Sequence, residues 1–365
     1  MALLSLLDYE AHAQAPVVVT TNTTIRVMAS NLTSGGNQRY ETAGLNILKG
    51  LKPDIIAMQE FNVSNSFGIN TSTAIRSMID TTFGTNFVYF RETNSAYSIP
   101  NGIISRYSIT NSGSWIDSDT GVNDRGFAWV QIDLPGTNDL YVVSVHLKAS
   151  SGTTNENRRT AEANELTSLI ATNFPTNAWI IVAGDMNLFS ETEGAIIKFK
   201  TFLSDSPVPA DQSGDQDTNA GRNERYDRVL LSFSLTNRLT NVVLVSQIFS
   251  NGLVFDSRVY NPLSNVPPVL ATDSGVSNMQ HMAVVKDFKI DYTITNFVTV
   301  PPPILVLNST NIIRWQGLSN VTYSVQASTN LPTFSTVGTA VSATTNLSFT
   351  NQIGSVQRFF RVVYP

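Results

Sequence analysis

A strongly apolar stretch of the chain ends in a cluster of polar side chains. Residues 179–182, Trp-Ile-Ile-Val, have the composition of a buried strand, and Gly184, Asp185 and Asn187 follow directly. Carboxylate and amide oxygens bind hard divalent cations, and amides also hydrogen-bond phosphate oxygens. A solvated turn is the alternative interpretation of the same residues. The stretch therefore predicts either a turn or a site for metal and phosphate at the end of a sheet.

Other polar residues stand at the ends of apolar runs in the same way. They are Asn31 after "IRVMAS", Glu60 at the end of "DIIAMQE", His146 in "VVSVHLK", Asp227 at the start of "YDRVLL" and His281 before "MAVVKDF". Each one alone is explained by a turn, a solvated strand end or a structural histidine. Loops at sheet ends are where functional groups gather, however, and together these residues predict one site.

The donor types restrict which metal such a site would hold. Glu60 and Asp185 supply hard oxygen ligands suited to Mg²⁺ or Mn²⁺, or to Ca²⁺. The chain has no cysteine and only three histidines, of which His12 lies close to the N-terminus, so a typical zinc site would need carboxylates to complete it. The absence of cysteine also excludes disulfides.

The elements that must position these residues alternate between strands and helices from Ile25 to about Asp291. Strands are predicted at 25–30, 54–60, 86–90, 101–106, 126–132, 140–147, 178–185 and 226–232. Helices are predicted at 40–51, 72–83 and 158–171. This mixture fits an α/β domain of two sheets covered by helices.

The texture of the sequence changes near residue 298. Three prolines, Pro301–Pro303, favour an extended linker, and the short β-patterned runs after them lack any helix signal. We therefore predict a main α/β domain at 16–292, a proline-rich linker at 293–303 and a small all-β sandwich at 304–365. Residues 1–15 are interpreted as a signal-peptide remnant, because Ala13-Gln14-Ala15 resembles a signal-peptidase site; a disordered tail is the alternative.

Composition sets limits on the partners. Of the 365 residues, 42% are hydrophobic, which is enough for a sizeable core, and no apolar run is long enough to span a membrane. The net charge of −5 gives no global attraction to polyanions, so binding to nucleic acid would need a local basic patch or a metal. We expect a monomer that is secreted or located at the cell surface or in the periplasm.

Seven motifs in order resemble the endonuclease/exonuclease/phosphatase superfamily, in the branch similar to pancreatic-type deoxyribonuclease. They are the N-terminal strand with Asn31, "MQE", "NGIISRY", "VHLK", "AGDMN", "YDRVL" and "HMAVV", spread over residues 24 to 291. The loop before Asp227 resembles a bacterial secreted branch of this superfamily. The resemblance implies a four-layer α/β/β/α sandwich of two packed sheets, with the site at one edge.

The resemblance also implies that the domain at 16–292 is a metal-dependent phosphoesterase, and it implies a role for each residue. Glu60 would bind the divalent ion, and Asn31 would help to hold the metal or the phosphate. Asp185 would orient or deprotonate the attacking water, or bind a second ion. Asn187 would hydrogen-bond a phosphate oxygen, and Asp227 would orient His281. His146 and His281 would flank the phosphorus, each polarised by a carboxylate. Gly184 would let the backbone turn so that Asp185 and Asn187 point at the phosphate.

Substrate choice is less constrained by the sequence. A basic rim of Arg158, Arg159, Arg222, Arg225 and Arg228 would track a nucleic-acid backbone, although ordinary solvated arginines are the alternative. The residues predicted to bind phosphate or substrate are Asn101, Arg158, Arg159, Arg222, Arg225 and Gln280. We expect an endonuclease acting on DNA. The first alternative is a phosphomonoesterase or phospholipase C-like enzyme of the same fold, and the second is a catalytically weak binding protein.

One position departs from the family pattern. The terminal motif usually reads Ser-Asp-His, whereas this chain has Met279-Gln280-His281, so that an amide replaces the aspartate. An amide attracts a divalent cation less strongly and stabilises a neighbouring imidazolium less. We expect the site to depend on Glu60 and Asp185 for the metal and on Asp227 for His281.

Overall fold

The computed structural model describes residues 14–63, 70–93, 99–118, 125–299, 306–307, 312–330, 333–350 and 359–363. The chain divides into two compact units. One is Asn22–Tyr292, and the other combines Met1–Thr21 with Thr293–Pro365. All the residues predicted to do chemistry lie in the first of them.

Two sheets form the centre of the unit Asn22–Tyr292. Over the described residues, the first sheet has the order β11-β15-β1-β2-β4-β3, with β14 paired to β15, and the second has the order β5-β6-β7-β8-β10-β9. The first contains β1 (Gln14–Ser30), β2 (Ile55–Met58), β3 (Val88–Arg91), β4 (Gly102–Ser105), β11 (Leu239–Thr240), β14 (Leu253–Phe255) and β15 (Ala283–Thr299). The second contains β5 (Ile109–Trp115), β6 (Phe127–Ile132), β7 (Leu140–His146), β8 (Trp179–Asp185), β9 (Leu203–Ser204) and β10 (Asp227–Ser232).

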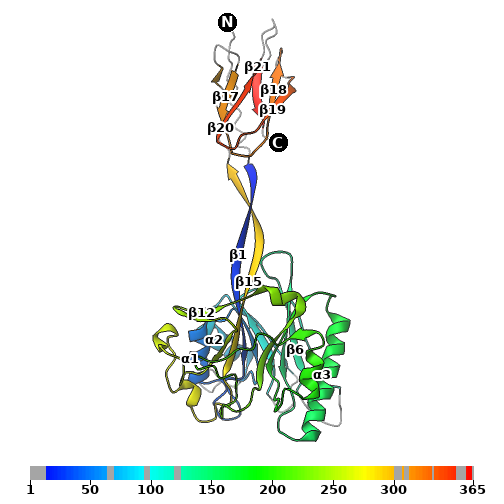
Figure 1. Cartoon of the computed structure of the whole chain (residues 1–365), viewed down its shortest axis with the longest axis vertical. Coiled ribbons are helices and arrows are strands. Elements are labelled where there is room, and N and C mark those ends of the chain that lie inside the picture. The colour runs from blue at the N-terminus through cyan, green and yellow to red at the C-terminus, as the bar shows by residue number, and fades with distance from the viewer. Residues whose placement is uncertain are drawn as a thin grey trace. The chain divides into compact units, whose positions relative to one another are not determined.

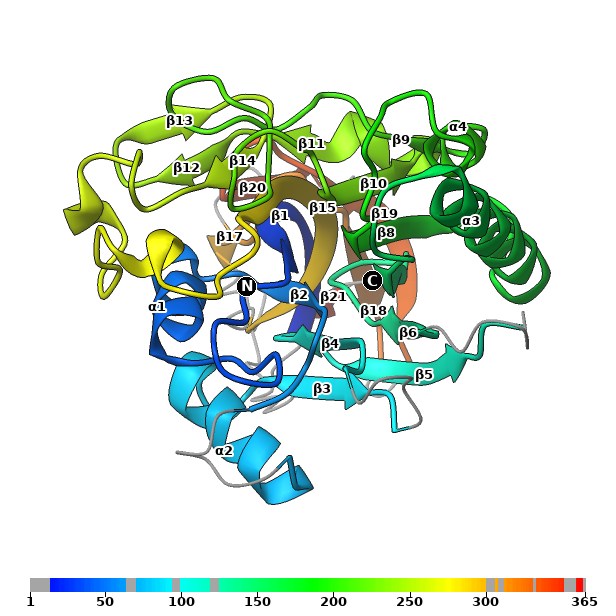
Figure 2. The same ribbon diagram turned by 90° about the horizontal axis from the view of Figure 1, so that it is seen from below.

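Helices cover the outer face of each sheet (Figures 1 and 2). The helices α1 (Thr42–Leu51) and α2 (Ser72–Phe83) pack on the first sheet, and α3 (Thr153–Asn173) and α4 (Gly194–Phe199) pack on the second. A third cluster of buried residues, including Ile103 and Ile181, fills the space between the sheets. The predicted four-layer α/β/β/α sandwich is therefore confirmed.

Side-chain alternation along the strands explains these layers. In β8, Ile181 and Ala183 point into the space between the sheets, whereas Ile180 and Val182 point toward α3 and α4. Successive residues of a strand face opposite sides, so a strand that is apolar at every position must be buried on both faces. The sequence pattern "WIIVAG" thus fixes β8 as a central strand.

Within the described residues, a short two-stranded sheet and three 3₁₀ helices complete this unit. They are β12 (Val242–Leu244) with β13 (Gln247–Phe249), and Phe233–Arg238, Leu263–Asn265 and Asp273–Gly275. Among the described helices, none is long and apolar enough to cross a membrane.

The second unit is an all-β module, as predicted. Its three-stranded sheets are β16 (Val306–Leu307), β17 (Ile312–Gln316) and β20 (Asn346–Thr350), and β19 (Ser335–Ala340), β18 (Tyr323–Ser328) and β21 (Phe359–Val363). Trp315, Tyr323 and Leu347 belong to the buried cluster that joins the two sheets.

The region assigned to the linker is partly strand. Residues 293–299 belong to β15, and the threonine, isoleucine, phenylalanine and valine residues of "TITNFVT" are types that favour strands. The three prolines lie outside the described residues, as do residues 1–13 of the predicted signal remnant. The domain boundaries remain a prediction.

Candidate active site

The predicted site residues converge because four strand ends of the two sheets meet. In the first sheet β1 and β2 run parallel, so Asn31 and Glu60 follow their neighbouring carboxyl ends. In the second sheet β7 and β8 are also parallel, and His146 is in register with Asp185. The antiparallel β10 then places Asp227 opposite Asp185. All five of these side chains are buried.

Asp185 lies at the centre of the site. Its Oδ2 accepts a hydrogen bond of 3.1 Å from Asn31 Nδ2. The same oxygen lies 3.2 Å from His146 Nε2 and 3.4 Å from His281 Nε2. Burial by itself raises the pKa of the Asp185 carboxyl, but the positive charges of the two histidines outweigh it and hold the pKa well below its usual range. Asp185 is therefore an anion shared by groups from both sheets.

His281 is held by a chain of polar contacts. Its Nδ1 lies 2.9 Å from Asp227 Oδ2, and that oxygen also accepts a 2.9 Å hydrogen bond from the Thr218 hydroxyl. Burial lowers the pKa of the His281 imidazole, but the carboxylates of Asp227 and Asp185 raise it above its ordinary value. The predicted orientation of His281 by Asp227 is thus present in the geometry.

His146 also has a carboxylate beside it, as predicted for each histidine. Its Nε2 contacts Asp185, because β7 ends at His146 in direct register with Asp185, whereas the Nδ1 of His281 contacts Asp227. The Nδ1 of His146 is buried without a hydrogen-bond partner among the described residues. Arg125 fixes the backbone here, donating from Nε to the His146 carbonyl at 2.8 Å and also to the Leu147 carbonyl.

Glu60 has a strained backbone and a dense set of donors. Its φ of 50° is in the left-handed region, which disfavours residues with a side chain. Gln38 Nε2 donates to its Oε1 at 2.9 Å, and the Thr33 hydroxyl donates to its Oε2. Asn31 Nδ2, at 3.4 Å from Oε1, connects Glu60 to Asp185. Strain held in place by so many contacts is typical of functional positions.

These residues fit a divalent cation. Asn31 Oδ1 is buried and has no hydrogen-bond partner within the described part of the chain, and an unsatisfied buried oxygen is costly unless a ligand or water binds it. This oxygen, the Glu60 carboxylate and the Asp185 carboxylate form the hard donor set predicted from the sequence. Ligand atoms of Asp185, Asp227 and His281 also lie within 4.8 Å of one another, but Nδ1 of His281 is already engaged by Asp227.

Asn187 and Gly184 stabilise the segment around Asp185. The Asn187 amide N–H donates to Asp185 Oδ1 at 3.0 Å, and its side chain donates to the Leu147 carbonyl at 3.1 Å. Gly184 lies within β8, and its role differs from the predicted turn. A Cβ at this position, where φ is 141°, would stand 2.1 Å from the Val145 carbonyl oxygen and 2.5 Å from Gln59 Nε2. Glycine is required because the neighbouring strand β7 and Gln59 of the first sheet both come this close.

The arginines do not form the predicted exposed basic rim. Arg158 pairs with Asp117, and Arg159 with Glu193 at 2.7 Å, and both arginines are buried on α3. The other three are also paired with carboxylates: Arg222 with Asp211, Asp215 and Asp256, and Arg225 and Arg228 with Asp205 and Glu191. Each guanidinium is therefore neutralised within the protein, which corrects the expectation of a rim that tracks a phosphate backbone.

Asn101 and Gln280 lie in different environments. Asn101 is fully buried at the start of the "NGIISRY" motif, and its Nδ2 donates to the Gly126 carbonyl at 2.8 Å. Its Oδ1 has no partner among the described residues. Gln280 is exposed, and its backbone carbonyl accepts a hydrogen bond from the Ala220 amide at 2.7 Å.

Sequence reasoning missed the residues that support the site. Gln59 donates to the Ser144 hydroxyl at 2.8 Å and Ser144 donates to the Met58 carbonyl at 2.9 Å, which joins the sheets beneath the site. Thr218, Thr33 and Gln38 were missed as well. Gln59 could have been found, since it precedes Glu60 in a strand that is otherwise apolar. Thr218 lies in a polar loop without any distinguishing pattern.

A buried set of carboxylates and histidines thus lies at the shared edge of the two packed sheets. The sequence model described as "Endonuclease/Exonuclease/phosphatase family" matches residues 45–246, more than half of the chain. The chain belongs to this family. Comparison with curated proteins yields no match.

Several solved structures are similar to this chain. An endonuclease/exonuclease/phosphatase from Beutenbergia cavernae DSM 12333 is 11% identical and has a TM-score of 0.49; the alignment covers 93% of this chain and 100% of that one. The human Nocturnin catalytic domain with bound sulfate is 17% identical and has a TM-score of 0.48; the alignment covers 78% of this chain and 98% of that one. An AP endonuclease from Archaeoglobus fulgidus is 15% identical and has a TM-score of 0.47; the alignment covers 72% of this chain and 99% of that one.

Proposed function

We propose that this protein is a divalent-metal-dependent phosphodiesterase whose substrate is nucleic acid, with DNA as the first choice and endonucleolytic cleavage as the mode. The observation that carries the proposal is the convergence of Asn31, His146 and His281 on one oxygen of Asp185. Three donors around one buried carboxylate, beside a second carboxylate on His281, suit in-line attack of water on a phosphoryl group.

In this proposal Glu60, Asn31 and Asp185 hold the metal, which is Mg²⁺ or Mn²⁺, or Ca²⁺. When bound, the ion supplies positive charge to the phosphoryl oxygens and to the leaving oxygen. Asn31 presents its unpartnered Oδ1, and Gln38 and Thr33 keep the Glu60 carboxylate in place.

The remaining residues act on the phosphate and the water. His281, aligned by Asp227 and positively charged through its raised pKa, donates a hydrogen bond from Nε2 to a phosphoryl oxygen. Asp185, an anion across the physiological pH range, orients the attacking water. His146 contacts the same oxygen of Asp185 as His281 does, and Asn187, in the turn after β8, would hydrogen-bond a phosphate oxygen.

A second candidate function is hydrolysis of a small phosphoester, either a phosphomonoester or a phospholipid. The observation that favours it is that the five arginines are paired with carboxylates of the protein. Their positive charges are therefore compensated and attract a long polyanion less strongly. A catalytically weak binding protein of the same fold is the third candidate.

Degradation of supercoiled plasmid separates these candidates. The protein is incubated with plasmid and, in parallel, with bis(p-nitrophenyl) phosphate, p-nitrophenyl phosphate and a phosphocholine ester, each with Mg²⁺, Mn²⁺ or Ca²⁺ and with EDTA. Nicking that EDTA abolishes and that His281→Ala lacks supports the DNA proposal. Turnover of a monoester or phosphocholine ester with intact plasmid supports the second candidate, and no turnover of any substrate supports the third.

We also propose that the protein acts as a monomer outside the cytoplasm; the signal-like residues Ala13-Gln14-Ala15 support export. Fractionation of expressing cells, N-terminal sequencing of the mature protein and its mass in solution test this. An intact Met1 on cytoplasmic protein would overturn the export proposal.

A further inference from the structure

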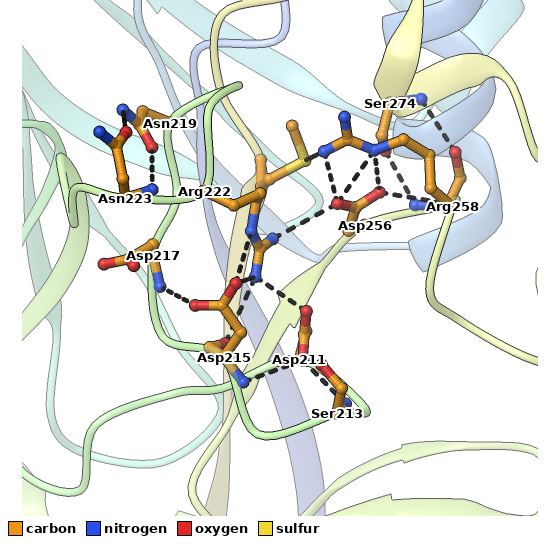
Figure 3. A network of polar contacts seen from close by, with 12 residues as sticks. Asp211, Ser213, Asp215, Asp217, Asn219, Arg222, Asn223, Asp256, Arg258 and Ser274 are labelled. Carbon is orange, nitrogen blue, oxygen red and sulfur yellow. Dashed lines mark hydrogen bonds and ion pairs between the residues drawn. The ribbon is translucent and has the colours of Figure 1, made fainter.

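Arg222 is surrounded by the carboxylates of three aspartates, Asp211, Asp215 and Asp256 (Figure 3). Its Nη2 donates to Asp211 Oδ2 at 2.8 Å, its Nε donates to Asp215 Oδ2 at 3.1 Å, and its Nη1 lies 3.5 Å from Asp256 Oδ2. Asp211 and Asp256 are buried, and Arg222 itself has a φ of 52°. Because its planar guanidinium group contacts three carboxylates, the positive charge of Arg222 is used within the protein.

These contacts connect two separate parts of the chain. Asp211 and Asp215 belong to the segment 211–224, as does Arg222, whereas Asp256 directly follows β14. The strand β14 pairs with β15, with Phe255 opposite Ala283, two residues after His281. Arg222 thus connects the segment 211–224 to the end of β14, which pairs with β15, the strand that follows His281.

The other side of the segment contacts the His281 region directly. Asn219 forms a β-bridge with His281, and the Met282 amide donates to the Thr218 carbonyl at 2.6 Å. The Thr218 hydroxyl donates to Asp227 Oδ2, the oxygen that also contacts His281 Nδ1. Thr218 therefore connects the segment held by Arg222 to the Asp227–His281 pair.

Removing the guanidinium would have consequences at a distance. Buried carboxylates that lose their cation repel one another and tend to move toward water. Asp211 and Asp215 can move only with their segment, which would withdraw Thr218 from Asp227 and Met282. A lysine would keep the charge but would lack the planar fork that reaches several carboxylates together.

We propose that Arg222 is a positioning residue that holds Thr218, and through it Asp227 and His281, in the geometry for phosphoester hydrolysis. This inference rests on the proposed function. It replaces the expectation that Arg222 contacts the substrate, because all three of its nitrogens face carboxylates of the protein.

The first experiment compares kcat and KM in Arg222→Ala, Arg222→Lys and Arg238→Ala. Arg238 is the control, since it is an arginine paired with a carboxylate, with Nη1 3.0 Å from Asp291 Oδ2, but has no described contact with residues 211–224 or with Met282. We expect Arg222→Ala to lower kcat about tenfold or more with KM nearly unchanged, Arg222→Lys to be intermediate, and Arg238→Ala to stay close to wild type. A raised KM at wild-type kcat would mean substrate contact and would overturn the proposal, as would equal losses in the Arg222→Ala and Arg238→Ala variants.

A double-mutant cycle tests whether the effect passes through Thr218. If Arg222 acts by holding Thr218, the combination of Arg222→Ala with Thr218→Val should lose no more activity than the more damaged single variant. Losses that multiply would show that the two residues act independently, which contradicts the proposed connection.

Amide hydrogen exchange provides a test without substrate. In Arg222→Ala the amides of residues 218–220 and of Met282 should exchange faster than in wild type, while those of β8 keep their protection. Unchanged exchange at Met282 overturns the positioning role. Arg222→Lys provides the same comparison if the alanine variant does not fold, which loss of protection in β8 would reveal. Because exchange needs no turnover, this result stands even if the proposed function fails.

Discussion

Glu60 combines a strained backbone with buried polar contacts, which makes it the most informative single residue of the site. Glu60→Gln keeps the shape of the side chain and removes its charge. We expect hydrolysis to fall by about 100-fold or more, with an unchanged circular dichroism spectrum, because a neutral amide binds a divalent cation much less strongly. Glu41→Gln, at an exposed glutamate, serves as the control. Near-normal activity and metal dependence in Glu60→Gln would falsify the metal assignment.

Gln280 replaces the aspartate that the family pattern carries before the histidine, and its side chain is exposed. His281→Ala should abolish most turnover, whereas Gln280→Ala should have a smaller effect, because the backbone contact of Gln280 with Ala220 survives the substitution. Gln280→Asp should mainly lower the Mg²⁺ concentration needed for half-maximal rate, by adding a negative charge. Rates measured against Mg²⁺ concentration decide this. If only Gln280→Asp is active, the wild-type chain is a catalytically weak binding protein.

Glu92 makes the stability of the fold depend on pH. Burial raises the pKa of its carboxyl from 4.5 to about 7, despite the hydrogen bond from the Asn101 amide. A raised pKa means that the folded state holds the proton more tightly, so this contribution is full below about pH 4.5 and is lost as the pH rises through 7. We expect the free energy of unfolding of wild type, relative to Glu92→Gln, to fall by about 2 kcal/mol between pH 5 and pH 8. Urea unfolding at the two pH values measures it, and a constant difference between the proteins contradicts it.

At the scale of elements, Gly184 marks where the second sheet touches the first. Gly184→Ala should lower the free energy of unfolding by at least about 2 kcal/mol, because the new Cβ overlaps the Val145 carbonyl. Gly152→Ala is the matched control, since Gly152 also has a positive φ, of 95°, but open space around its Cβ position. Thermal unfolding of both variants separates the steric cost from the conformational one. Equal losses would indicate that only backbone conformation matters at Gly184.

In the unit Asn22–Tyr292, strands and helices were predicted well where the hydrophobic residues recur with a clear period. The helix predicted at 72–83 matches α2, and the apolar run at residues 179–182 lies in the central strand β8. The strand β5 was missed, because "ITNSGSW" is polar at most positions and lies at the edge of its sheet. Edge strands need only one buried face and therefore leave a weaker pattern.

Prediction of the site succeeded for residues at strand ends and failed for long-range charge pairing. Asp185 and Asp227 could be placed together because strand ends gather at a sheet edge. Nothing local indicated that Arg159 would pair with Glu193 or Arg228 with Asp205, since those partners come from other segments. A cluster of arginines in sequence thus gave a false impression of an exposed basic surface.

At the scale of the whole molecule, the unit Asn22–Tyr292 contains every site residue and all three buried clusters that surround the paired sheets. A chain ending at Asn296 should therefore stay folded and hydrolyse bis(p-nitrophenyl) phosphate at a rate similar to that of the full chain. Size-exclusion chromatography and initial rates on equal molar amounts test this. An insoluble or inactive truncated chain would show that residues after 296 are needed to complete the fold.

The division of the site between the two sheets has a consequence for refolding. Asn31 and Glu60 follow strands of the first sheet, whereas His146 and Asp185 end strands of the second, so neither sheet alone assembles the donors. Partly folded chains, with β-structure but undocked sheets, should be inert. Catalytic activity would then report the last step of folding. It should return after the far-ultraviolet dichroism has recovered, at the time when the apolar side chains between the two sheets become buried.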